Sequence, residues 1–257
     1  MATFWPAAAE AGEAPTTPVL AGATLLLPGV SIGNVGQLAV DLLVHSLKLR
    51  RVGFLESQYV LPSVGNDAYS ATGTGKLAVE MELYGADGGV FVLQQRSPPV
   101  VGCQRLFAAE LMDWVAASGF AKLVVLASID SALREDLQIT GPQLRYVATG
   151  GAEEDARCAA MGLQALQAGE GRDGIEESQL RIAPWPLIQE ARHRGADSLA
   201  LLAYASEGDN VPDAMHMASA AVQYLGMVPP EEAAAFRWEL PGSWCNLYGP
   251  PVNEMMY

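Results

Sequence analysis

Basic residues are scarce in this chain. Its 257 residues include 15 lysines and arginines against 29 aspartates and glutamates, which gives a formal net charge of −14. Binding to nucleic acid or to an anionic membrane needs clustered Lys and Arg side chains to meet the phosphate groups. The composition therefore argues against both kinds of partner, and it fits a solvated surface or a protein partner that is locally basic.

Cysteines are equally few. Cys103, Cys158 and Cys245 are scattered and form no Cys-x-x-Cys pair. An odd number of isolated cysteines argues against a disulfide framework and against a structural zinc site. We therefore expect a protein of a reducing compartment. We also predict no cofactor and no bound metal ion.

Targeting signals and long apolar runs are also missing. No Lys or Arg precedes Lys48, whereas a secretory signal needs a basic start and a mitochondrial presequence needs arginines. The most apolar early stretch, residues 25–44, is interrupted by Pro28 and Asp41 and is not expected to span a bilayer. These features predict a protein of the cytoplasm and nucleus.

Half of the residues are hydrophobic, which is enough for a sizeable core. Short apolar runs alternate with segments of helical periodicity, a pattern that predicts an α/β sandwich with a mixed sheet. Residues 77–84 alternate in polarity and precede the turn sequence at residues 85–88, which predicts a β-hairpin with residues 90–93. Further strands are expected at residues 24–27, 52–55, 123–129, 146–148 and 199–204, and helices after Asn34, around residues 107–115 and 157–167, and from Pro212.

Composition divides the chain into three parts. Residues 1–21 are rich in Ala, Pro, Thr and Glu and are expected to form a flexible leader. We find no long linker in residues 22–245 and predict a single α/β domain there. Residues 246–257 contain Pro250 and Pro251, which favour an extended C-terminal tail.

One motif is typical of an enzyme. Gly29-Val30-Ser31-Ile32-Gly33 matches G-x-S-x-G between an expected strand and helix, where a hydrolase places its nucleophile. His216, with Asp209 or Asp197, would complete the order Ser, Asp, His. However, at most one strand precedes this motif, whereas hydrolases of that fold have several. A tight turn that needs small residues is the simpler interpretation.

A second loop carries oxygen ligands that could suit a divalent cation. Glu207, Asp209 and Asn210 lie together just before the helix that opens at Pro212. Capping of that helix explains Asp209 and Asn210 without any metal. The residues alone therefore indicate a soluble α/β domain with no convincing catalytic set.

Six segments in one order resemble the proteasome assembly chaperone family. The motifs VSIGNVGQLA and SEGDNVPDA are the most specific of them, and the region around Gly169 to Ser178 shows no match. The segments are LLLPGVSIGNVGQLAVDLLV (residues 25–44), LPSVGNDAYS (61–70), WVAASGFAKLVVLASI (114–129), DLQI (136–139), ASEGDNVPDA (205–214) and RWELPGSW (237–244).

The resemblance implies a three-layer α/β/α sandwich with a mixed, largely parallel sheet, similar in shape to nucleoside phosphorylases and hydrolases but without their activity. It implies a non-enzymatic chaperone that forms a heterodimer with proteasome assembly chaperone 1. The pair is expected to bind proteasome α-subunits, to promote α-ring formation and to prevent off-pathway ring dimers.

The resemblance also draws attention to the last three residues, Met255, Met256 and Tyr257. Relatives in this family insert a C-terminal hydrophobic–Tyr–any sequence into pockets between α-subunits. Here Tyr257 is last and Met256 holds the penultimate place, which departs from that pattern. Two interpretations stay open: partner binding by these residues, or an unstructured end.

Overall fold

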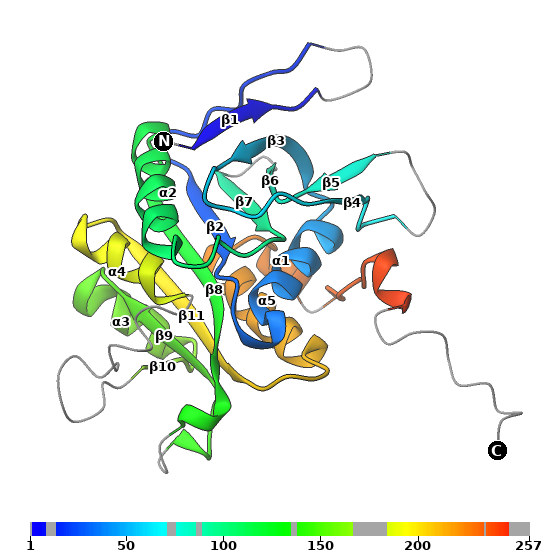
Figure 1. Cartoon of the computed structure of the whole chain (residues 1–257). Helices are drawn as coiled ribbons and strands as arrows, with labels where there is room; N and C mark the ends of the chain where they lie inside the picture. The colour runs from blue at the N-terminus through cyan, green and yellow to red at the C-terminus, as the bar shows by residue number, and fades with distance from the viewer. Residues whose placement is uncertain are drawn as a thin grey trace, which may run out of the picture.

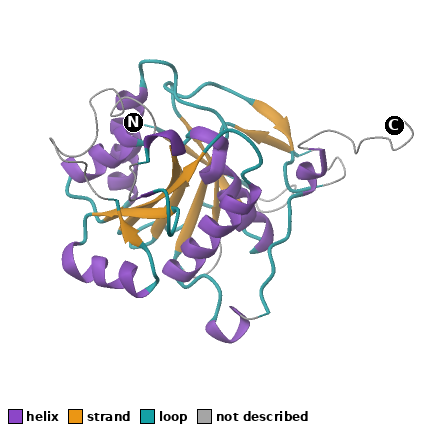
Figure 2. Cartoon of the chain, turned by 90° about the horizontal axis from the view of Figure 1, so that it is seen from below, coloured by secondary structure: helices purple, strands orange, loops and turns teal. Residues whose placement is uncertain are grey.

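The computed structural model describes residues 2–8, 14–70, 76–85, 89–134, 138–166, 184–233 and 235–246. Strands and helices alternate along most of this chain and build one large sheet with helices on both faces (Figures 1 and 2). Within the described residues, no helix combines the length and apolarity needed to cross a bilayer.

The main sheet has nine strands in the order β1-β3-β6-β7-β2-β8-β11-β9-β10. Its centre, from β7 through β2 and β8 to β11, is parallel, while the flanking pairs are antiparallel except for β9 with β10. The mixed sheet is therefore as predicted. The strands are β1 (Thr3–Pro6), β2 (Thr24–Pro28), β3 (Arg50–Glu56), β6 (Met81–Gly85), β7 (Val90–Gln95), β8 (Lys122–Asp130), β9 (Leu144–Ala148), β10 (Gln164–Ala165) and β11 (Ser198–Ala205).

Strand alternation creates two cores, one on each face of the sheet. Leu25 and Leu27 of β2 pack among α2 and α4, whereas Leu26 between them packs among α1 and α5. Both faces are thus covered, which confirms the three-layer α/β/α arrangement (Figure 1). The helices are α1 (Val35–Ser46), α2 (Gln104–Ser118), α3 (Gly151–Ala160), α4 (Trp185–His193), α5 (Val211–Leu225) and α6 (Pro230–Ala233), with short 3-10 turns η1 (Ile32–Asn34), η2 (Ser131–Leu133) and η5 (Gly242–Asn246).

The structure corrects three sequence predictions. The start of the expected leader is not loose, because Thr3–Pro6 form β1 and pair antiparallel with β3. Residues 77–84 do not form one strand, since β5 (Leu77–Val79) pairs with β4 (Val64–Asn66) in a separate two-stranded sheet. The helix expected over residues 157–167 begins and ends earlier, as α3.

The remaining elements agree more closely with the sequence. Strands β6 and β7 form the predicted hairpin, and the buried central strand is β8. Helix α2 buries Phe107, Leu111, Trp114 and Val115, as its periodicity indicated. The acidic, Gly-rich stretch near residues 169–178 lies outside the described residues.

Candidate functional site

The G-x-S-x-G loop lies at the carboxyl ends of β2 and β8, the place where open α/β sheets bind small ligands. The Gly29 amide donates a hydrogen bond to the Leu126 carbonyl at 2.8 Å, and the Ser128 amide donates one to Ser31 Oγ at 2.8 Å. The loop is thus bonded along the end of β8.

Each glycine of this loop allows a close contact. A Cβ on Gly29 would lie 2.7 Å from Cβ of Pro184, and a Cβ on Gly33 would lie 2.4 Å from Nδ2 of Asn210. Gly33 also has a φ of 65°, which side-chain-bearing residues rarely adopt. The tight-turn interpretation explains why these positions hold glycine. The contact of Gly33 with Asn210 also joins the two most specific segments of the resemblance, VSIGNVGQLA and SEGDNVPDA.

The Ser31 hydroxyl makes two hydrogen bonds within the protein: it donates to the Gly29 carbonyl at 2.8 Å and accepts from the Ser128 amide at 2.8 Å. Its oxygen also lies 2.9 Å from Ser128 Oγ. Ser128 in turn donates to the carbonyl of Ile32. These bonds give Ser31 a structural role, because they hold the loop against β8.

The expected partners of Ser31 are not gathered around it. Asp197 forms an ion pair with Lys122 at the opposite, amino-terminal edge of the parallel strands. The Asp209 carboxylate accepts a hydrogen bond from the Val211 amide at the start of α5, and His216 is exposed on that helix. Asp209 thus satisfies one of the first amides of α5, as its predicted capping role requires. Asn210 is the N-cap residue, but its side chain donates to the carbonyls of Ser206 and Gly208 and makes no capping bond, so that part of the prediction is wrong.

Asn34 also differs from its prediction. It is the N-cap residue of α1, as expected, but it adopts the left-handed conformation and its side chain makes no capping hydrogen bond. Across the part of the chain that the structure describes, no group of three or more His, Cys, Asp or Glu residues is placed to hold a metal ion.

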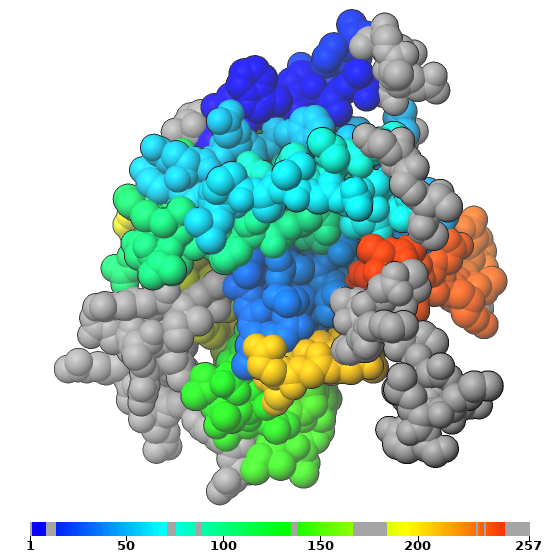
Figure 3. All heavy atoms as spheres, turned by 45° about the vertical axis from the view of Figure 1, so that its right-hand side comes forward, coloured from blue at the N-terminus to red at the C-terminus, as the bar shows by residue number. Residues whose placement is uncertain are grey.

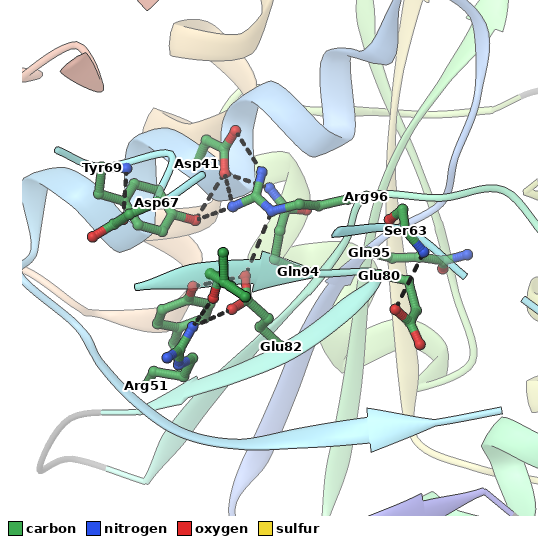
Figure 4. A network of polar contacts seen from close by, with 12 residues as sticks. Asp41, Arg51, Ser63, Asp67, Tyr69, Glu80, Glu82, Gln94, Gln95 and Arg96 are labelled. Atoms are coloured by element: carbon green, nitrogen blue, oxygen red, sulfur yellow. Dashed lines mark hydrogen bonds and ion pairs between the residues drawn. The ribbon is translucent and has the colours of Figure 1, made fainter. Parts of the chain in front are cut away.

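A buried polar network forms a second feature of the molecule (Figure 4). Asp41 of α1 accepts hydrogen bonds from Tyr69 at 2.8 Å and from Gln94 at 2.6 Å, and it forms an ion pair with Arg96 at 3.2 Å. Arg96 also lies 3.5 Å from Glu82, which is only 1% exposed. A helix, two strands and a loop are joined here through charged groups.

Glu82 is the second centre of this network. It pairs with Arg51 of β3 at 2.6 Å and accepts a hydrogen bond from Tyr84 at 3.1 Å. Each buried carboxylate is thus paired with arginine and further hydrogen-bonded, as burial of a charge requires.

The network holds its tyrosines in the neutral form. Burial raises the pKa of Tyr69 well above its ordinary value, and the neighbouring Asp41 carboxylate raises it further. Burial alone would lower the pKa of Arg96, but the adjacent Asp41 raises it above its ordinary value. A tyrosine that stays neutral and an arginine that stays charged suit a structural anchor rather than proton transfer.

Tyr69 anchors the loop that connects β4 with β5 to the body of the protein. Because Val64 pairs with Val79 and Asn66 with Leu77, these four side chains lie on one face of the small β4–β5 sheet. Val64 is 69% exposed and Leu77 is 55% exposed.

We call Val64 and Leu77 the β4–β5 surface. Exposed apolar side chains gathered on one element are typical of protein–protein contact sites. Sequence reasoning missed this surface because the alternation in residues 77–84 indicated one strand of the main sheet.

The C-terminal part of the described chain packs against the helical layer of α1 and α5. Trp238 and Trp244 are partly buried against that core, which agrees with their predicted role as packing anchors. Trp238 Nε1 donates to Ser219 Oγ at 3.0 Å. Met255, Met256 and Tyr257 lie outside the described residues, so partner binding by the tail stays a prediction.

Comparisons with known proteins cover nearly the whole chain. A model of the PAC2 family matches residues 25–232. The chain is 31% identical to the Homo sapiens protein named proteasome assembly chaperone 2, over 94% of this chain and 97% of that protein. The Danio rerio protein of the same name is 30% identical, over 93% of this chain and 96% of its own.

Solved structures share the fold. Pyrococcus furiosus PbaA, described as an archaeal homolog of proteasome-assembly chaperone, superposes with a TM-score of 0.63 at 16% identity, over 91% of this chain and 92% of that chain. Pyrococcus furiosus PbaB, described as an archaeal proteasome activator, gives a TM-score of 0.62 at 16% identity, over 91% and 95%.

Proposed function

Because the chain belongs to the PAC2 family, we propose that it is a chaperone of proteasome assembly. The observation that carries this proposal is the end-to-end similarity to animal proteins named proteasome assembly chaperone 2. The contacts of the Gly29–Asn34 loop support it, because the Ser31 hydroxyl bonds β8 and the expected Asp and His partners are not gathered around it.

In finer detail, we propose that the chain pairs with proteasome assembly chaperone 1 and that the pair binds proteasome α-subunits in the cytoplasm and nucleus. Binding to one face of an incomplete α-ring would block association through that face and so prevent ring dimers. It would also stabilise the bound intermediate by mass action. No bond is made or broken in this mechanism, and only exposed protein surfaces act.

We propose that the β4–β5 surface is one of the contacting surfaces. Its apolar side chains can be buried by a protein partner, and the buried network behind it holds the adjoining loop through Tyr69. A positioned loop loses little conformational entropy on binding, which favours affinity.

The test is native mass spectrometry of the affinity-purified full-length protein from its own cells. We expect masses that correspond to a paralogous chaperone and to proteasome α-subunits. Recovery of the chain alone, or with unrelated proteins, would contradict the proposal.

A surface variant sharpens this test. Leu77→Asp should weaken recovery of a partner by at least about tenfold, because a buried charge without a counterion is costly. The control Leu133→Asp places the same charge at a residue of similar exposure, 48%, in η2. Equal recovery with both variants would remove the β4–β5 surface from the proposal without affecting the chaperone role.

A further inference from the structure

A groove runs between the N-terminal segment and strand β3, with a volume of about 1150 Å³. We call it the β3 groove. One wall is formed by the start of the chain, and the other by β3 and by the loop that carries Tyr69. The lining residues are Pro6, Ala7, Ala8, Thr16, Pro18, Leu49, Arg50, Arg51, Val52, Phe54, Asp67, Tyr69, Lys76 and Tyr84.

The β3 groove is basic in an acidic protein. Arg50, Arg51 and Lys76 line it against one acidic residue, Asp67, although the whole chain has only 15 lysines and arginines. Arg51 is held by Glu82 and stacks over the Phe54 ring at 4.8 Å, while Arg50 is exposed. Cations beside apolar walls suit an extended segment that combines apolar side chains with carboxylates.

The described C-terminal segment ends beside this groove. Glu239 forms an ion pair with Lys48, which directly precedes the groove residue Leu49. Farther on, the Ser243 amide donates to the carbonyl of Ala68, which lies between the groove residues Asp67 and Tyr69. Figure 3 shows this segment, in orange and red, against the body of the molecule beside α1.

We propose that residues 247–257 bind in the β3 groove of their own chain. Eleven residues in extended conformation reach about 35 Å. They would bring the Glu254 carboxylate to the side of Arg50 and Lys76, and Met255, Met256 and Tyr257 would supply apolar side chains for the groove walls.

This intramolecular contact makes the C-terminal residues less available to any other protein. A partner that binds the same residues must first displace them from the groove. Its apparent affinity is therefore lower than its intrinsic affinity, in proportion to the fraction of chains whose C-terminal residues are undocked. The proposal rests on the groove and on the contact of the described residues up to 246 with the loop beside it, and it holds or fails independently of the proposed function.

The experiment uses full-length protein with ¹³C-labelled methionine methyl groups. The signals of Met255 and Met256 are assigned with Met→Leu variants and are compared with a synthetic peptide of residues 247–257. Docking predicts shifted and broadened methyl signals in the protein. Signals that coincide with those of the peptide would overturn the proposal.

Charge variants locate the binding site. Arg50→Glu should move both signals to the peptide positions, with a loss of roughly tenfold in the ratio of docked to undocked chains, while Arg50→Lys should retain most of the docking. Arg105→Glu, which makes the same change at an exposed residue of α2, should have no effect. Insensitivity to Arg50→Glu would exclude this groove.

Two other occupants are distinguished in the same samples. If the tail enters the groove of a second copy, the shifts disappear on dilution, which overturns the intramolecular contact. If a separate protein is the true occupant, the purified chain shows peptide-like signals from the start, which also contradicts the proposal.

Discussion

At several positions of this protein, two backbone segments lie so close together that only a small residue fits. A Cβ on Gly36 would lie 2.1 Å from the carbonyl oxygen of Leu126, so the first turn of α1 packs directly on the backbone of β8. Only glycine permits that contact without a shift of the helix. The helix carries Asp41 into the buried network, and its position therefore affects the whole anchor.

Gly36→Ala should destabilise the protein by about 1–3 kcal/mol, because overpacking outweighs the better helix propensity of alanine. Urea unfolding gives the change in the free energy of unfolding. Gly65→Ala is the control, since a Cβ there meets nothing within 4 Å. Equal stability of the two variants would show that α1 can move away from β8 without cost.

Ser31→Ala tests whether the G-x-S-x-G loop is structural. We expect a loss of about 1 kcal/mol in unfolding free energy, since the Ser128 amide loses its acceptor. Partner recovery should be unchanged. The control is Ser131→Ala in η2, where the hydroxyl of a half-buried serine forms only a solvent-exposed hydrogen bond with Ser206, so the cost should be less than about 0.5 kcal/mol. A Ser31-dependent esterase activity of the purified protein would contradict this interpretation.

Among the secondary-structure elements, α3 is joined to the sheet through charge as well as through packing. Lys122 of β8 lies 2.7 Å from Glu154 of α3 and 3.1 Å from Asp197. Tyr224 of α5 donates to the other Glu154 oxygen at 2.5 Å. Three elements thus meet at one carboxylate that is 8% exposed.

This arrangement predicts a pH dependence of stability. Burial alone would raise the pKa of Glu154, but hydrogen bonds from Lys122 and Tyr224 lower it below its ordinary value of 4.5. The carboxylate therefore stabilises the fold above pH 4.5, and this contribution is lost as the pH falls through the lower pKa of the folded state. Unfolding free energy should decrease with acidification in that range.

Glu154→Gln should flatten this decrease below pH 4.5 and lower stability at neutral pH, where Lys122 loses an ionic partner. Chemical unfolding at a series of pH values measures both effects. Glu153→Gln, at the exposed neighbouring residue, should leave the slope as it is. A Glu154→Gln profile parallel to that of the unaltered protein would contradict the assignment.

For the molecule as a whole, one nine-stranded sheet connects the N-terminal strand with the last strand, β11. Its two cores share the same strands, because alternate residues of β2 and β8 serve opposite faces. Loss of one core exposes the strands that hold the other. Folding should therefore be cooperative across both faces.

We accordingly expect a single unfolding transition. Tryptophans report on separate regions, with Trp114 and Trp185 in one core and Trp238 against the other. Tryptophan fluorescence and far-UV circular dichroism should give coincident urea curves. Two separated transitions would show that the chain contains independent folding units, contrary to the single domain predicted over residues 22–245.

The sequence by itself determined the features that depend on local pattern. Apolar runs and helical periodicity predicted β8, β11, α2 and α5. Burial of one face spaces the apolar residues periodically along the sequence, and burial of both faces gives a continuous apolar run, so either pattern is visible within a short segment. The turn sequence after Tyr84 predicted the hairpin of β6 with β7. The ordered motifs indicated the family that the comparisons later confirmed.

Only the tertiary structure decided what depends on distant residues. Asp41 and Arg96 are 55 positions apart, and β1 pairs with a strand about fifty residues away. No pattern within a short segment of sequence could therefore predict either contact. The β4–β5 surface and the β3 groove arise in the same way. Long-range pairing is selected by the total free energy of the packed chain, and a short window of sequence contains too little of that energy to reveal it.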